Sequence, residues 1–244
     1  MSKVAVIIAA AGAGRRFGGQ VKKPFAQIDN RPVFIRTIEL FVTRDDVCQV
    51  ILVVSPDDYD VVREKYAANL MFMDVQLVKG GNERCESVKL ALEEVADDAD
   101  LIAVHDAVRP CVLESWIDKL FARAAETGAS IPAAPLAGTI KRVADGLVTE
   151  TVSREGLYEA QTPQVFAADV LRAAYQALEG TGRPTDDAQV VEQAGHPVAI
   201  VETDRRNLKI TTPFDLTLAG AVLRTLTKGK KSSGPRSPFD EAQW

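Results

Sequence analysis

Short apolar runs alternate along the chain with longer segments in which apolar side chains recur every three to four positions. A continuous apolar run between turn residues is typical of a buried strand, and the longer period is typical of an amphipathic helix. Alternating strands and helices predict a doubly wound α/β fold, with a mostly parallel sheet and helices on both faces. The predicted strands are Val4–Ile8, Gln49–Val54, Val75–Val78, Leu101–Val104, Ser130–Ala134 and Val198–Glu202. The predicted helices are a run from Pro32 through Phe41, then Tyr59–Leu70, Glu83–Val95, Trp116–Glu126, Ala167–Leu178 and a last helix from Thr212.

One segment interrupts this alternation. Thr139–Ala144 and Leu147–Val152 are strand-like runs on either side of Asp145-Gly146, a dipeptide that favours a two-residue hairpin turn. No helix follows to cover this hairpin, and its side chains are mostly polar. We therefore expect an arm, at about residues 137–158, that projects from the body and contacts a partner. An extra edge hairpin of the central sheet is the alternative.

The end of the chain combines a well-marked helix with a tail. Thr212 can cap the helix, Pro213 suits its first turn, and Asp215 follows three residues after the cap. From Gly229 onward the chain is rich in Lys, Ser, Gly and Pro, a composition typical of disorder. We expect one domain over residues 1–228 and a disordered tail over residues 229–244.

The amino-acid composition limits the classes of binding partner that we expect. The chain has 34 acidic and 29 basic residues, a formal net charge of −5. This acidic balance disfavours nucleic acid and anionic membranes as partners, and no stretch approaches the ~20 apolar residues that span a bilayer. Cys48, Cys85 and Cys111 match neither a zinc site nor a disulfide framework, so we expect a reducing compartment, the cytoplasm.

Against this acidic background, a basic and glycine-rich segment follows the first strand. Bare glycine backbone lets N–H groups approach an anion, and cations neutralise it, so the segment predicts a triphosphate-binding loop. A tight turn with solvated basic side chains is the structural alternative. A dinucleotide fingerprint is disfavoured because Pro24 and paired glycines interrupt the helix that it needs. The residues concerned are Gly12, Gly14, Arg15, Arg16, Gly18, Gly19, Lys22 and Lys23.

Other polar segments follow predicted strands, at the edge where open α/β sheets bind ligands. Gly80-Gly81 leads into a helix that carries Ser87, and bare backbone with a hydroxyl suits the edge of a base. Asp106 ends an apolar strand, where it can bind a ribose hydroxyl or a magnesium-linked phosphate. We expect His105 to hold neighbouring loops by hydrogen bonds rather than to act as an acid or base. For the glycine pair, a simple turn at the start of a helix is the alternative.

A scattered set of polar residues completes the candidates. Arg154 and Lys209 can bind a second phosphate. The Arg154 guanidinium can donate two hydrogen bonds to it, and the Lys209 ammonium acts as a point charge. Taken singly, each is more often a surface charge. Thr162-Pro163-Gln164 and Thr185-Asp186-Asp187 belong to the same set.

Together these motifs resemble the 2-C-methyl-D-erythritol 4-phosphate cytidylyltransferase family, within the sugar- and polyol-phosphate cytidylyltransferases. The resemblance runs from about Val4 to Leu226. Many family members carry Pro-Lys-Gln where this chain has Lys22-Lys23-Pro24. The matching motifs are Ala10-Ala11-Gly12-Ala13-Gly14-Arg15-Arg16, Lys23, Gly80-Gly81 with Arg84 and Ser87, His105-Asp106-Ala107-Val108-Arg109-Pro110, Thr139 with Lys141-Arg142, Arg154 with Gly156-Leu157, Thr162-Pro163-Gln164, Thr185-Asp186 and Asn207-Leu208-Lys209.

The resemblance implies a nucleotidyltransferase, Rossmann-like fold and transfer of a cytidylyl group from CTP to methylerythritol phosphate, with release of pyrophosphate, in non-mevalonate isoprenoid biosynthesis. It implies Mg²⁺ held mainly by the CTP phosphates, with Asp106 as a candidate ligand, and a homodimer formed by the arms. The implied catalytic residues are Arg16 and Lys23. The implied nucleotide contacts are Ala10, Ala11, Gly12, Gly14, Gly81, Ser87 and Asp106. The implied acceptor contacts are Ala107, Arg109, Thr139, Arg154, Thr185 and Lys209.

Two other functions stay open at this point. A ribitol-5-phosphate cytidylyltransferase would share the fold and the reaction, and residue types do not separate the two acceptors. A non-catalytic, nucleotide-binding regulatory module is the alternative from another class. The joint presence of Arg16, Lys23, Arg154 and Lys209 argues against that module, since binding CTP alone needs no second phosphate grip.

Overall fold

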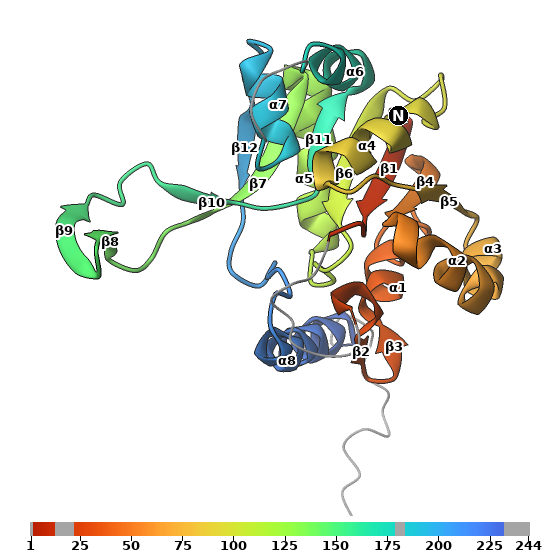
Figure 1. Ribbon diagram of the computed structural model, residues 1–244, viewed down its shortest axis with the longest axis horizontal. Coiled ribbons are helices and arrows are strands. Elements are labelled where there is room, and N and C mark those ends of the chain that lie inside the picture. The colour runs from red at the N-terminus through yellow and green to blue at the C-terminus, as the bar shows by residue number, and fades with distance from the viewer. Residues whose placement is uncertain (1, 13–21, 179–183, 232–244) are drawn as a thin grey trace, which may run out of the picture.

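A twisted, mostly parallel sheet forms the centre of the computed structural model, which describes residues 2–12, 22–178 and 184–231, with side chains up to residue 226 (Figure 1). Its strand order is β10-β7-β11-β6-β1-β4-β5, and β12 pairs with β7. Strands β5, β4, β1 and β6 are parallel neighbours, as are β7 and β12, whereas β10 and β11 run antiparallel. The strands are β1 (Val4–Ala9), β4 (Val47–Val54), β5 (Val75–Lys79), β6 (Leu101–Asp106), β7 (Ala129–Pro135), β10 (Tyr158–Ala160), β11 (Gln164–Ala167) and β12 (Ala199–Glu202).

Helices cover both faces of the sheet, as the apolar pattern predicts. Alternate residues of β1 point to opposite sides: Val6 packs with α1, α2 and α5, whereas Ile7 packs with α4 and α6. The C-terminal helix α8 packs on the small hairpin of β2 (Gln27–Ile28) and β3 (Arg31–Pro32). Among the described residues, no helix is long and apolar enough to cross a membrane. The helices are α1 (Val33–Ile38), α2 (Pro56–Lys65), α3 (Ala67–Phe72), α4 (Arg84–Glu93), α5 (Glu114–Thr127), α6 (Ala168–Gln176), α7 (Asp187–Gln193) and α8 (Pro213–Lys231).

The predicted hairpin is present and stands apart from the sheet. β8 (Ile140–Ala144) and β9 (Leu147–Val152) pair with each other in a separate two-stranded sheet, so the edge-hairpin alternative is wrong. Asp145 and Gly146 have φ of 49° and 78°, the positive values that a tight hairpin turn of this kind requires. Figure 1 shows the hairpin at the end of extended chain, beyond β10.

Three parts of the chain differ from the sequence prediction. The single helix expected at Tyr59–Leu70 is two helices, α2 and α3, which break at Tyr66. The ring of Tyr66 is buried against Phe25 and Phe34, and this tertiary packing overrides local helix propensity. Elements β10, β11 and α7 are absent from the sequence prediction because they are too short to produce a periodic signal. Helix α8 extends to Lys231, past the predicted start of the tail, and the remaining tail lies outside the described residues.

Replacing Leu52 by Ala should destabilise the whole fold. Leu52 is fully buried in β4, and removing a buried leucine costs about 2–5 kcal/mol of the free energy of unfolding, because lost burial and the cavity add together. Urea denaturation measures this cost. The control is Met71→Ala, since Met71 is 82% exposed and its loss should change stability by less than about 0.5 kcal/mol. Equal midpoints for the two variants would contradict this account of the core.

Candidate functional site

The carboxyl ends of β1, β4 and β6 meet at one edge of the sheet. Main-chain N–H groups of Ala10, Gly80 and Ala107 donate to carbonyl oxygens at the ends of neighbouring strands, at 2.8, 2.7 and 3.0 Å. Segments that are far apart in the sequence therefore lie side by side where open α/β sheets bind ligands. Ala10 and Ala11 are nearly buried there, and a Cβ added at Gly12 would meet no atom within 4 Å.

The Gly80-Gly81 turn depends on glycine because it packs closely against its surroundings. A Cβ on Gly80 would lie 2.6 Å from Ser87 Oγ and 2.9 Å from the carbonyl oxygen of Val54. The buried Ser87 hydroxyl accepts a hydrogen bond from the Gly81 N–H at 3.0 Å and donates one to the carbonyl of Glu83 at 2.7 Å. Ser87 thus shapes this turn, and its contact with a base stays a prediction.

Asp106, at the end of β6, has three cations around its carboxylate. Lys209 Nζ and Arg109 Nε lie 2.9 and 3.2 Å from Oδ2, and Arg84 Nε lies 3.5 Å from Oδ1. Burial opposes ionisation of Asp106, but these charges outweigh it and hold its pKa well below the usual range. Arg84 also pairs with the carboxylate of Asp187, so three cations face two carboxylates, and the one net positive charge that remains favours an anionic ligand.

Beneath this cluster, a buried hydrogen-bond network holds the chain in place. Thr162 Oγ1 accepts from the Asp106 N–H at 3.0 Å and lies 2.8 Å from His105 Nδ1, to which it donates. His105 Nε2 donates to the carbonyl of Arg109 at 3.1 Å. Burial lowers the pKa of His105 to about 4, so the ring is neutral near pH 7. The expectation that His105 holds neighbouring loops by hydrogen bonds is confirmed, and the expectation that it does not act as an acid or base stays a prediction.

Asn207 extends the same network toward Lys209. Its side-chain amide donates to the main-chain carbonyl of Thr162 at 2.9 Å, and the main-chain carbonyl of Asn207 accepts from Arg109 Nη1 at 2.8 Å. Neither Thr162 nor Asn207 has a predicted individual role, because a short polar side chain in a loop gives no distinctive sequence signal. Arg84 likewise stands in a matching motif without a role, since an arginine at the start of a helix resembles a surface charge.

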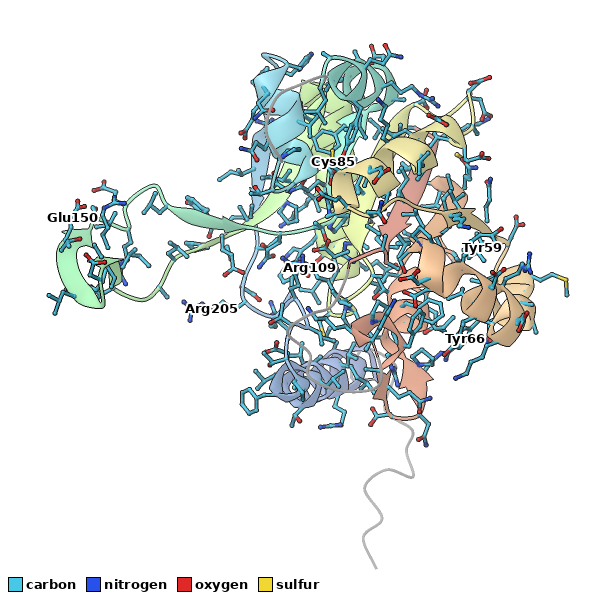
Figure 2. All side chains as sticks on the ribbon, viewed as in Figure 1. Tyr59, Tyr66, Cys85, Arg109, Glu150 and Arg205 are labelled. Atoms are coloured by element: carbon cyan, nitrogen blue, oxygen red, sulfur yellow. The ribbon has the colours of Figure 1, made fainter. Side chains whose placement is uncertain are left out.

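The structure brings Asp106, Ala107, Arg109 and Lys209 together, but not the arm residues. Arg154 and Thr139 are exposed on the arm, where the Arg154 guanidinium donates to the carbonyl of Ala137. Figure 2 shows Glu150 of the arm well away from Arg109. Among the described residues, no hydrogen bond or ion pair joins Thr139 or Arg154 to this cluster.

Thr185 has local contacts only, among those described. Its N–H and hydroxyl donate to Oε1 of Gln189, at 2.7 and 3.2 Å. The next residues begin α7: Asp186 caps the helix and Asp187 is its first residue. Asp187 accepts a hydrogen bond from Arg84, and Asp186 accepts one from Gln164, so both join this segment to the rest of the site.

The predicted phosphate loop is described only at its two ends, and Gly14 and Arg16 lie outside the described residues. Lys23 begins a short 3-10 helix, η1 (Lys23–Phe25), in which Pro24 is buried. Phe25 stacks on Tyr66 with ring centroids 6.2 Å apart, and the Lys22 ammonium lies 2.8 Å from the carboxylate of Asp58. The Lys22-Lys23-Pro24 sequence is thus held by contacts on both of its sides, at Lys22 and at Phe25.

The described residues fit a resident metal poorly. They contain no group of three or more His, Cys, Asp or Glu side chains that could hold an ion. Both oxygens of Asp106 already face cations. A divalent ion at this edge would therefore depend on ligands brought by a nucleotide.

A doubly wound sheet with an anion-favouring carboxyl edge is an architecture typical of nucleotide-binding proteins, which include the nucleotidyltransferases. The family model described as 2-C-methyl-D-erythritol 4-phosphate cytidylyltransferase (IspD) matches residues 4–225. The chain belongs to this family.

Individual relatives agree with the family model. The chain is 47% identical over 233 residues to 2-C-methyl-D-erythritol 4-phosphate cytidylyltransferase of Rhodopirellula baltica, covering 91% of this chain and 95% of the relative. It is 41% identical over 235 residues to the bifunctional enzyme IspD/IspF of Rhodospirillum rubrum, covering 96% of this chain and 60% of that protein. The crystal structure of the cytidylyltransferase from Thermus thermophilus matches with a TM-score of 0.76 at 31% identity, covering 91% of this chain and 99% of that one.

Replacing His105 by Gln should weaken the dependence of stability on pH. Because the pKa of His105 is about 4 in the folded chain and 6.5 when unperturbed, unfolding takes up a proton between these values. His105 therefore makes stability rise with pH across this window, by about 2 kcal/mol between pH 5 and 6.5. Urea denaturation at several pH values should show that this contribution is absent from His105→Gln.

The matched control is His196→Gln, because His196 is the other histidine and is exposed. Its variant should keep the wild-type pH dependence. A His105→Gln curve parallel to the wild-type curve would contradict a buried, neutral histidine.

Proposed function

We propose that the chain transfers the cytidylyl group of CTP to 2-C-methyl-D-erythritol 4-phosphate, giving 4-diphosphocytidyl-2-C-methyl-D-erythritol and pyrophosphate, a step of non-mevalonate isoprenoid biosynthesis. The observation that carries this proposal is the family match over residues 4–225. The cation cluster around Asp106 supports it, because both substrates are phosphates. The chain is a cytidylyltransferase and therefore an enzyme.

The reaction needs charge neutralisation rather than a base. The attacking group is an acceptor phosphate oxygen, which is already ionised near pH 7, and it displaces pyrophosphate from the α-phosphorus of CTP. Positioning and electrostatic stabilisation can then supply most of the catalysis. A buried, neutral His105 accords with such a mechanism.

We assign the substrates to neighbouring parts of the sheet edge. Arg16 and Lys23 neutralise the charge that develops at the α-phosphate. The nucleotide is held by the turns after β1 and β5 and by the end of β6, through Ala10, Ala11, Gly12, Gly14, Gly81, Ser87 and Asp106. The acceptor is held by Ala107, Arg109, Thr185 and Lys209, with Thr139 and Arg154 supplied by an arm.

Magnesium enters this proposal with the nucleotide. Mg²⁺ brought with CTP would supply charge neutralisation at the triphosphate. Asp106 would have to exchange one of its cations for the metal in order to act as a ligand. The chain's own contribution is the cationic edge that receives the triphosphate.

A homodimer would account for the arm. Val143, Leu147 and Val148 on the arm are 57%, 72% and 61% exposed, and a lone two-stranded hairpin is marginal in water. Packing on a second copy would cover these side chains. It would also bring Thr139 and Arg154 to the partner's cluster. The free cysteines and acidic composition are consistent with a cytoplasmic location.

Pyrophosphate release with a panel of substrates tests the proposed activity. CTP should be used far better than ATP or GTP, and UTP should be weaker, because the close packing at Gly80-Gly81 leaves little room for a purine. Methylerythritol phosphate should be preferred to ribitol 5-phosphate as acceptor. Equal turnover with ATP would refute the base assignment, and preference for ribitol 5-phosphate would establish the alternative acceptor. CTP binding without any turnover would favour the regulatory module.

Mixing two inactive variants tests the shared site. Lys23→Ala should be severely impaired, since loss of one transition-state donor costs about 2–4 kcal/mol. Arg154→Ala should be impaired because the acceptor phosphate loses a proposed contact. If each site takes Lys23 from one chain and Arg154 from the other, a heterodimer has one site with both wild-type residues. Refolded mixtures should regain up to about half of the wild-type activity per heterodimer, if the sites act independently.

Heterodimer formation is verified by mass, and each variant refolded alone is the control. A mixture that contains heterodimers but stays inactive would mean that both residues act within one chain. The arm would then be a structural element only.

A further inference from the structure

Arg84 lies between two carboxylates, Asp106 and Asp187, that are far apart in the sequence. It is the first residue of α4, directly after the Gly80-Gly81 turn. Its Nη2 donates to Asp187 Oδ2 at 2.6 Å, and its Nε lies 3.5 Å from Asp106 Oδ1. The guanidinium therefore connects the start of α7 to the end of β6.

The Asp187 side of this connection is rigid. Asp187 is fully buried, and its Oδ1 accepts a hydrogen bond from the Tyr175 hydroxyl of α6 at 2.6 Å. Burial and the negative charge of Asp187 raise the pKa of Tyr175, which keeps the hydroxyl as a donor. Gln164 of β11 also holds the first turn of α7, through Asp186 and the N–H of Ala188.

On the other side, Arg84 faces the Asp106 oxygen that the remaining cations leave open. Lys209 and Arg109 share Oδ2, whereas Arg84 faces Oδ1. An ion on each side restricts rotation of the carboxylate. Arg84 thereby keeps Oδ2 turned toward Lys209, the most exposed of the three cations.

The glycine turn next to Arg84 does not depend on it. Gly81 N–H bonds to Ser87 Oγ at 3.0 Å, and Asn82 N–H bonds to Glu86 Oε2 at 2.8 Å. These hydrogen bonds would remain if Arg84 were replaced. A change at Arg84 should therefore affect the Asp106 cluster and α7 more than the turn.

We propose that Arg84 is a positioning residue for the acceptor phosphate, although it stands beside the predicted base-binding turn. By holding Asp106 and Asp187 together, it orients Lys209 and fixes the segment that carries Thr185. This inference rests on the proposed function, because it assigns Lys209 and Thr185 to the acceptor.

Arg84→Lys separates positioning from charge. Lysine keeps the positive charge, but its ammonium is a point donor and cannot serve both carboxylates as the planar guanidinium does. We expect the KM for methylerythritol phosphate to rise about tenfold or more, while the KM for CTP changes less than about threefold. Tyr175→Phe removes only the hydroxyl that steadies Asp187 and should give a smaller effect in the same direction.

The matched control is Arg172→Lys. Arg172 of α6 donates to the carbonyls of Leu92 and Val95, at 3.0 and 2.8 Å, and so joins α6 to the other end of α4. Its variant should lower stability, measured by urea denaturation, without raising the acceptor KM. An equal rise in acceptor KM for both arginine variants would mean that Arg84 is only structural.

A double-mutant cycle with Lys209→Ala tests the route of the effect. If Arg84 acts through Lys209, adding Arg84→Lys to Lys209→Ala should raise the acceptor KM by much less than Arg84→Lys does alone. Fully additive changes, or a larger effect on CTP than on the acceptor, would overturn the inference. If the unmutated chain is active and Arg84→Lys has the same kinetic constants, the result contradicts this inference but not the proposed function. A wild-type chain without turnover contradicts the proposed function and this inference with it.

Discussion

The ion cluster at Asp106 is the interaction on which the site depends. A carboxylate at the end of a buried strand is unfavourable unless cations pair with it, and here the cations come from the first turn of α4, from after β6 and from before α8. They can meet only because the register of β1, β4 and β6 brings the carboxyl ends of these strands to one level. The sheet thus converts three distant basic residues into one anion-favouring edge.

The same cluster explains how an acidic protein can attract phosphates. The chain carries a formal net charge of −5, yet the three cations at this edge exceed the paired carboxylates of Asp106 and Asp187 by one charge. Local arrangement rather than overall charge decides what the edge attracts. The histidine nearest to it is buried and neutral, with both ring nitrogens in hydrogen bonds. Such a site suits electrostatic catalysis of phosphoryl transfer better than proton transfer.

The body and the arm follow different physical rules. In the body, buried apolar side chains on both faces of the sheet determine where each strand lies. Over the described residues, the arm's strands β8 and β9 pair only with each other, and their side chains are mostly exposed. A lone two-stranded hairpin is marginal in water, and the shared-site proposal supplies a second copy to cover it.

The strands, the hairpin turn and the parallel order of the sheet could be predicted from the sequence, because each depends on residues that are close together in the chain. Apolar runs predicted the central strands, Asp145-Gly146 predicted the hairpin turn, and the order of elements predicted the parallel sheet. Only the tertiary structure decided the break at Tyr66, which follows from ring packing, and the pairing of Arg84 with Asp187, 103 positions away. The two kinds of feature differ in the sequence separation over which the underlying interactions act. Backbone propensity and periodicity act over a few residues, whereas ion pairs and ring contacts depend on where folding brings distant segments together.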